Sequence, residues 1–198
     1  MKYLLRAFVL AAALALLAPI RSQAQTFIAD LTGPNESPAN TSPGKGHAKV
    51  TINDATSIMT VDVTFSGLQG TTTASHIHAP TAAPFTGTAG VATTTPTFAG
   101  FPLGVTSGTF STVLDMTQAT SYNPAFVTAN GGTTAGAQAA LFSAIRGGEA
   151  YLNIHTSSFA GGEIRGFLTA APEPGTLSLM GGLGVCGALF LLRRRYSS

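Results

Sequence analysis

Apolar and polar residues alternate in short stretches through the middle of the chain, between residues 25 and 170. Alternation with a period of two is typical of β-strands that bury one face and expose the other. The clearest example is residues 58–65, where four apolar side chains share one face and three polar side chains share the other. By the same criterion, further strands are predicted at residues 27–31, 47–52, 75–79, 90–95, 109–114, 149–156 and 163–168.

A single helix is predicted over residues 133–146, because its alanines, Leu141 and Ile145 recur at helical spacing and a glycine follows. Residues 80–104 are rich in Thr, Gly and Pro, so they are predicted to form long loops around the short strand at 90–95. Many short strands with one helix favour a mainly β fold, a Greek-key antiparallel β-sandwich.

The first 24 residues do not follow this pattern. Lys2 and Arg6 precede an apolar run at residues 7–18, and small residues then lead to Ala24. This order is typical of a secretory signal peptide, and we expect signal peptidase to cut after Ala24. The run is shorter than the roughly 20 residues that a membrane-spanning helix needs. An uncleaved anchor is the alternative.

The last part of the chain, residues 171–198, begins with a break in the strand pattern at Pro172, Glu173 and Pro174, since proline fixes φ and lacks an N–H. An apolar stretch at 177–192 follows and is predicted to form a transmembrane helix, which would reach about 24 Å. It ends in a basic cluster composed of Arg193, Arg194 and Arg195. Because such clusters stay on the cytoplasmic side, the domain is predicted to lie outside.

A Pro-Glu-Pro motif, an apolar span and an arginine cluster, in this order at the very end, resemble the PEP-CTERM sorting signal. The resemblance implies that an exosortase of a Gram-negative bacterium cleaves the tail near residues 172–174, after a brief stay in the inner membrane. It also implies delivery to the cell surface or to an exopolysaccharide or biofilm matrix. An ordinary tail anchor that is never cut is the alternative.

The distribution of charge also separates the two ends of the chain from its middle, residues 25–170. Six of the ten basic residues lie in the two ends, so the middle holds four basic and seven acidic residues and carries a net charge of −3 with neutral histidines. A domain with this charge has no basic patch for nucleic acid, which excludes that class of partner. The single cysteine, Cys186, lies in the tail, so residues 25–170 contain no thiol and no disulfide.

Three histidines are the main candidates for chemistry. His76 and His78 are two residues apart on a predicted strand, so they share a face, opposite Ile77. His155 lies on another predicted strand, opposite apolar neighbours. If the two strands are adjacent, the three imidazoles could hold one copper or zinc ion. The alternative is that these are exposed histidines with no function or with cross-strand hydrogen bonds.

Two further residues are weaker candidates for the same ion. His47 could add a fourth ligand, and Glu163 could be a ligand or could support one. Glu163 also shares a predicted strand face with Arg165, so an exposed ion pair between the two is the simpler expectation.

The middle of the chain resembles the CHRD domain in three motifs, Ser-His-Ile-His-Ala at 75–79, Ala-Tyr-Leu-Asn-Ile-His-Thr at 150–156 and Gly-Gly-Glu-Ile-Arg-Gly at 161–166. This resemblance covers nearly all of residues 26–168. It implies a β-rich fold, and it implies less about function.

The His-x-His strand is also similar to the copper strand of the copper/zinc superoxide dismutases, which are Greek-key sandwiches. Four histidines are too few for a two-metal site of that kind, and the domain has no cysteine for that family's disulfide. No nucleophile elbow or phosphate loop is present, so we predict no catalytic residues. The preferred hypothesis is a non-enzymatic, matrix-associated binding module of the cell envelope. The alternative is a mononuclear copper or zinc protein, capable of redox chemistry with copper.

Overall fold

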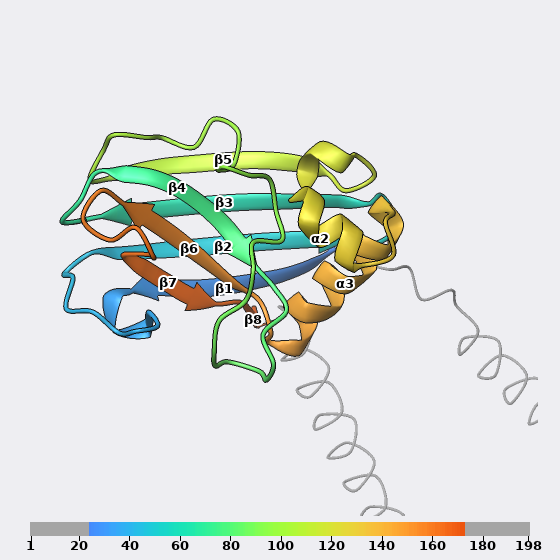
Figure 1. The fold of residues 1–198 in the computed structure, drawn as a ribbon, viewed down its shortest axis with the longest axis horizontal. Helices are drawn as coiled ribbons and strands as arrows, with labels where there is room; N and C mark the ends of the chain where they lie inside the picture. The colour runs from blue at the N-terminus through green and yellow to red at the C-terminus, as the bar shows by residue number, and fades with distance from the viewer. Residues whose placement is uncertain (1–23, 173–198) are drawn as a thin grey trace, which may run out of the picture.

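The computed structural model describes residues 24–172. The predicted signal sequence before Ala24 and the predicted sorting tail after Pro172 lie outside the described residues. Within the described range, all the strands belong to one antiparallel sheet (Figure 1). Its strands are β1 (Gln25–Thr32), β2 (Lys45–Asn53), β3 (Ile58–Ser66), β4 (Thr72–His78), β5 (Gly108–Asp115), β6 (Tyr151–Thr156), β7 (Ile164–Phe167) and β8 (Thr169–Ala170).

The sheet curls over itself into two layers. Its strand order is β4-β6-β7-β1-β2-β3-β5, with β8 paired to β1. Figure 1 shows β4, β6 and β7 in front of β1, β2 and β3, with β5 beyond β3 at the top. The predicted mainly β, antiparallel fold is confirmed, but the two layers belong to one continuous sheet. The reason lies in β1, which pairs with β2 along its whole length and also contacts β7 and β8 on its other edge.

The core fills the space between the two layers. Along β3 the burial alternates as the sequence predicts, with Met59, Val61, Val63 and Phe65 buried. From the facing layer, apolar side chains of β4 and β6 are fully buried. Each such side chain contributes roughly 1.5–3 kcal/mol on leaving water. The fully buried residues of that layer include Ile77, Leu152, Ile154 and Ile164.

Two α-helices lie at one end of the sheet (Figure 1). The predicted helix is confirmed as α3 (Thr134–Gly147), which Thr133 caps at its N-terminus by accepting a hydrogen bond from the Gly136 N–H. A second helix, α2 (Pro124–Ala129), was not predicted because six residues are too few for a periodic pattern. Two 3₁₀ turns, Gly33–Asn35 and Ala119–Ser121, complete the regular structure.

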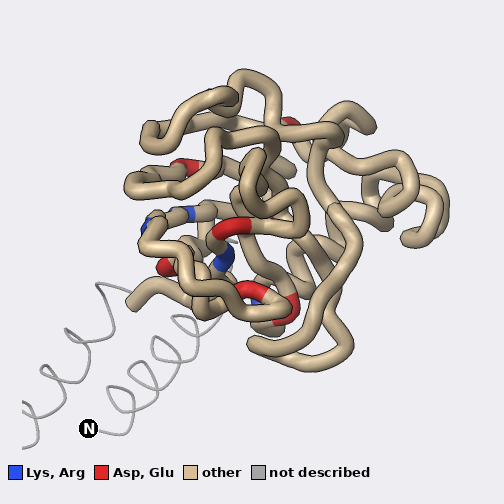
Figure 2. The backbone as a smooth tube through the Cα atoms, turned by 60° about the vertical axis from the view of Figure 1, so that its left-hand side comes forward, with Lys and Arg blue, Asp and Glu red and all other residues tan. Residues whose placement is uncertain are grey.

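A long segment between β4 and β5, residues 79–107, runs along the free edge of β4 and reaches the histidine rings of that strand through Pro96 and Ala89. We call this segment the covering loop. The strand predicted at 90–95 is wrong: this part of the chain forms only isolated bridges, one of them from His78 to Val91. Its backbone nevertheless bonds to β4 at several points along the strand: the Thr72 N–H donates to Val105 O at 2.8 Å, the Phe98 N–H to Ser75 O at 3.1 Å and the Ala92 N–H to Ile77 O at 2.9 Å. The covering loop contains no charged residue. Figure 2 shows Lys, Arg, Asp and Glu at only a few places along the tube, most of which is tan.

The two ends of the described chain lie next to each other. The Ala171 N–H donates to Thr26 O at 2.9 Å, and Ala24 and Pro172 are both exposed. Between these ends, no helix is both long and apolar enough to cross a membrane.

Gly166 on β7 lies close against the backbone of β1. A Cβ atom at this position would overlap the Asp30 carbonyl and lie 3.2 Å from the Ala29 Cβ. Backbone cannot move aside as a flexible side chain can, so Gly166→Ala is expected to lower the free energy of unfolding by about 2–3 kcal/mol. Urea denaturation measures this loss. Gly161→Ala is the matched control, since a Cβ there meets nothing within 4 Å, and an equal loss in both variants would contradict the prediction.

Candidate metal centre

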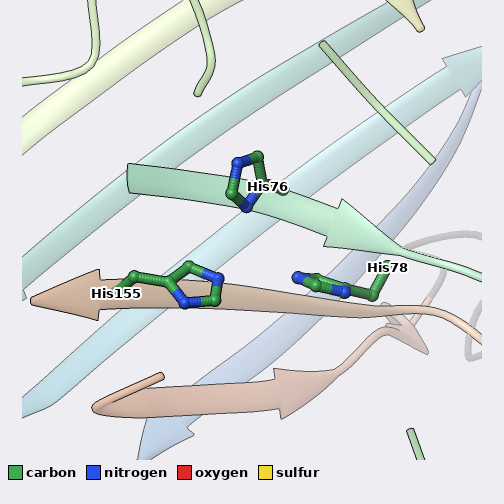
Figure 3. A group of neighbouring side chains, drawn as sticks. All are labelled: His76, His78 and His155. Atoms are coloured by element: carbon green, nitrogen blue, oxygen red, sulfur yellow. The ribbon is translucent and has the colours of Figure 1, made fainter. Parts of the chain in front are cut away.

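The three predicted histidines come together on adjacent strands. His76 and His78 lie on β4 and His155 lies on β6, and these two strands pair antiparallel. Their ring centroids are 5.2–5.8 Å apart. One nitrogen of each ring lies within 4.8 Å of those of the other two. Figure 3 shows the rings grouped around a common space between the strands.

Hydrogen bonds to backbone carbonyls fix the orientation of all three rings. His76 Nε2 bonds to Pro96 O at 2.5 Å, His78 Nδ1 to Ala89 O at 2.9 Å, and His155 Nδ1 to Ala160 O at 2.9 Å. A carbonyl oxygen can only accept, so each of these ring nitrogens carries the hydrogen. The other nitrogen of each neutral ring therefore keeps a lone pair that is free to coordinate an ion.

These other nitrogens are buried and have no hydrogen-bond partner: His76 Nδ1, His78 Nε2 and His155 Nε2. Buried polar atoms are normally paired, so three unpaired acceptors in one cluster require an explanation. A ring whose second nitrogen donates to a carbonyl is the usual arrangement of a metal-ligating histidine. The donor set and its supports fit a single copper or zinc ion.

Burial keeps the three imidazoles neutral. It lowers the pKa of His76 and His155 and lowers that of His78 to about 4, although in each ring a carbonyl hydrogen bond opposes the shift. Protons therefore compete less with an ion for the lone pairs. Repulsion from His155 lowers the pKa of His76 and His78 further.

The histidines lie on the face that the sequence predicts, and this face is buried. The three side chains lie opposite the core, as the position of Ile77 predicts. The alternative of exposed histidines does not hold for His76 and His78, which are only 6% and 8% exposed. The covering loop supplies Pro96 and Ala89 over β4, so the face becomes an enclosed site. No sequence pattern predicts which face of a sheet a Thr-Gly-Pro-rich loop will cover.

Neither weaker candidate joins the cluster. Glu163 is fully buried, and its carboxylate accepts hydrogen bonds from four groups, so it has a structural role. Its donors are Ser42 Oγ at 2.6 Å, Thr156 Oγ1 at 2.7 Å, Gln69 N at 2.5 Å and Gly70 N at 3.0 Å. His47 lies on β2, where it bonds to Asp30 at 3.0 Å on an exposed surface.

The expected ion pair between Glu163 and Arg165 is also wrong. Arg165 is 5% exposed, and it donates to Asn35 O at 2.5 Å and to Gly87 O at 3.0 Å. Its guanidinium lies 4.6 Å from the centre of the Tyr151 ring, which stacks on His78 at 4.9 Å. Arg165 therefore lies behind the histidine cluster as a buried, fixed positive charge.

Glu36 is a site residue that the sequence reasoning missed, since a lone acid in a proline-rich loop gives no signal. It is 7% exposed, and its Oε2 lies 3.8 Å from Arg165 Nε, while its Oε1 has no partner. Both residues line a pocket of about 550 Å³, with Phe85 and Phe167 on its wall. Burial raises the pKa of Glu36 to about 7, and the nearby Arg165 charge only partly opposes this.

The raised pKa predicts how Glu36 affects stability. Its folded pKa of about 7 exceeds the ordinary glutamate value of 4.5. The stabilisation that the folded state gains from a protonated Glu36 is therefore full below pH 4.5 and is lost as the pH rises through 7. Glu36→Gln is therefore expected to be more stable than the wild type at pH 8, by about 1–3 kcal/mol. Urea unfolding at several pH values tests this. The control is Asp30→Asn, at an exposed position. The prediction is contradicted if Glu36→Gln is still more stable than the wild type at pH 4.5, or if Asp30→Asn gains the same stability.

Comparison with known proteins identifies the family. The family model described as "CHRD domain" matches residues 27–168, which is well over half of the chain. Comparison with curated proteins and with solved structures gives no match. The matched range holds all three histidines of the cluster and the strands that carry them. The chain belongs to the CHRD domain family.

Proposed function

We propose that this CHRD domain is a metal-binding module that holds one transition-metal ion between His76, His78 and His155. The observation that carries the proposal is the set of three buried ring nitrogens without partners, on rings whose other nitrogens donate to carbonyls. Imidazole nitrogen is a good ligand for both copper and zinc. A bound ion would supply Lewis-acid chemistry, and redox chemistry if it is copper.

The spacing of the three ring nitrogens is close to the spacing that one ion needs. One nitrogen from each ring lies within 4.8 Å of the others, whereas ligands on one ion with bonds of about 2.0–2.1 Å lie roughly 3.4 Å apart. Small rotations of the rings cover this difference. Since the carbonyls of Pro96, Ala89 and Ala160 set the ring orientation, little conformational entropy is lost on binding.

Metal titration tests the proposal. The full-length protein, purified in detergent, is titrated with copper and with zinc in competition with a chromophoric chelator. We expect a stoichiometry of one ion and a loss of at least about 100-fold in affinity in the His76→Ala/His155→Ala variant. His47→Ala is the control, because His47 is a histidine outside the cluster. Equal affinity in the wild type and the double variant would reject the metal function.

The cellular setting remains a separate proposal. We propose that the chain is exported, cut after Ala24, held in the inner membrane by its tail and released by an exosortase near Pro172. Exposure of Ala24 and Pro172 supports this, since a protease must reach both sites. Mass spectrometry of the exported protein tests it. Retention of Arg193–Arg195 in the mature pool would make the tail a permanent anchor.

A second candidate function, a binding module for matrix polysaccharide, rests on the pocket beside Glu36. Phe85 on its wall is 58% exposed, and its backbone has a φ of 58°, an unusual conformation for a large side chain. Aromatic surface beside polar groups suits a sugar ring. Phe85→Ala should weaken retention of the protein on purified exopolysaccharide in affinity electrophoresis. Unchanged retention would remove this candidate.

A further inference from the structure

The protein offers only neutral nitrogen ligands to an ion between the three rings. Among residues 24–172, no Asp, Glu or Cys joins the cluster of His76, His78 and His155. The covering loop that closes the site contains no charged residue. The carbonyls nearest to the rings are already engaged by the ring N–H groups. The charge of a bound ion is therefore not balanced by any anionic ligand.

Uncompensated charge in a buried site favours an ion of low charge. The cost of removing an ion from water rises with the square of its charge, so a dication pays about four times as much as a monocation of the same size. Zn(II) normally completes a set of four ligands with an anion or a water. Here the three free nitrogens are buried from solvent. A monovalent d¹⁰ ion is satisfied by three neutral ligands and needs no fourth.

The fixed positive charge of Arg165, behind the three histidines, also favours an ion of low charge. The Arg165 guanidinium stacks on one side of Tyr151, and Tyr151 stacks on His78 with the two rings only 5° from parallel. Carbonyls of Asn35 and Gly87 hold the guanidinium in place. Glu36 is the nearest counter-charge, and with a pKa of about 7 it is only partly ionised at neutral pH. The remaining field repels a dication more than a monocation.

We propose that the His76, His78 and His155 site selects monovalent copper, Cu(I), over Zn(II) and Cu(II). This inference rests on the proposed metal function of the same site. It assigns the domain to the handling of cuprous ion, in which binding or delivery of Cu(I) is the activity.

Competition under anaerobic conditions tests the selectivity. The full-length protein in detergent is titrated with Cu(I), kept reduced by ascorbate, against bathocuproine disulfonate. Zn(II) and Cu(II) are measured with their own chelators. Because the dication pays the larger desolvation cost, we expect Cu(I) to bind at least about 100-fold more tightly than Zn(II), and to lose this affinity in His76→Ala/His155→Ala. Binding of Zn(II) or Cu(II) to these histidines as tightly as Cu(I) would overturn the selectivity and leave the metal function intact. If none of the three ions binds to these histidines, both the selectivity and the proposed metal function are rejected.

Variants at Arg165 test whether its positive charge contributes to the selectivity for Cu(I). Arg165→Met removes the charge and is expected to lower the ratio of Cu(I) to Zn(II) affinity by about tenfold, whereas Arg165→Lys should largely preserve it. Circular dichroism verifies that both variants are folded. An unchanged ratio in folded Arg165→Met would show that the charge has no such role, and the wild-type comparison does not depend on either variant.

Discussion

Saturation with whichever of copper or zinc binds more tightly is expected to raise the melting temperature of the wild-type protein by about 8–16 °C. An ion present at 1,000 times its Kd stabilises the folded state by about 4 kcal/mol, and 1 kcal/mol corresponds to roughly 2–4 °C in a domain of this size. The effect should be large because the folded chain brings together nitrogens that are far apart in an unfolded one. Differential scanning calorimetry with and without the ion measures it.

The same experiment on His155→Ala should show almost no shift. Removal of His155 leaves two ligands on one strand, and the affinity of a site falls steeply when one of three ligands is lost. The His47→Ala protein should keep the full shift, since His47 bonds to Asp30 far along the sheet order from β4. A shift of equal size in His155→Ala and the wild type would mean that the ion binds elsewhere.

Glu163→Gln is expected to lower the free energy of unfolding by about 2–4 kcal/mol. The Glu163 carboxylate is fully buried and accepts hydrogen bonds from two hydroxyls and two backbone N–H groups. Glutamine has nearly the same shape, but its NH₂ group must face donors that the carboxylate oxygen accepted. At least one buried donor then loses its partner. Chemical denaturation measures the loss, and Glu149→Gln, a half-exposed position without such bonds, should change stability by less than about 0.5 kcal/mol.

The loss should also depend on pH. Burial raises the pKa of Glu163, but hydrogen bonds from Ser42, Thr156, Gln69 and Gly70 together outweigh burial, so the folded pKa lies below the ordinary glutamate value of 4.5. The stability that the ionised Glu163 carboxylate gives to the folded state is present above pH 4.5 and disappears as the pH falls through the folded pKa. The gap between the wild type and Glu163→Gln should therefore narrow in acid. A gap that stays constant well below pH 4 would contradict this account.

Local patterns predicted the parts of the structure that depend on local rules. The alternation in β3 reflects which side chains face the core, and the spacing of His76 and His78 places them on one face of any strand. The convergence with His155 required one further assumption, that β4 and β6 are neighbours, and the pairing of the two strands confirms it. The capped helix α3 was equally visible, because its signals lie within a single segment.

The features of the fold and the site that the sequence did not predict depend on contacts between segments far apart in the chain. The covering loop buries the histidines through the backbone carbonyls of Pro96 and Ala89. Every residue has a backbone carbonyl, so the sequence gives no sign of which ones will bond to the rings. Arg165 was expected to pair with its neighbour Glu163, but it bonds to Asn35 and Gly87 in two separate loops. Competition among all available donors decides such pairings, and a single sequence does not show which partners are within reach.

The position of β1 in the sheet has a consequence for how the chain acquires its structure. This strand is synthesised first, yet one of its edges is completed only by the last strands, where Thr32 pairs with Arg165 and Phe27 with Ala170. Long-range pairing of this kind slows folding and leaves a strand edge open in the meantime. A nascent chain that ends before β7 is therefore expected to remain sensitive to proteases. Vectorial synthesis keeps this domain incomplete, and so deformable, until its final residues emerge.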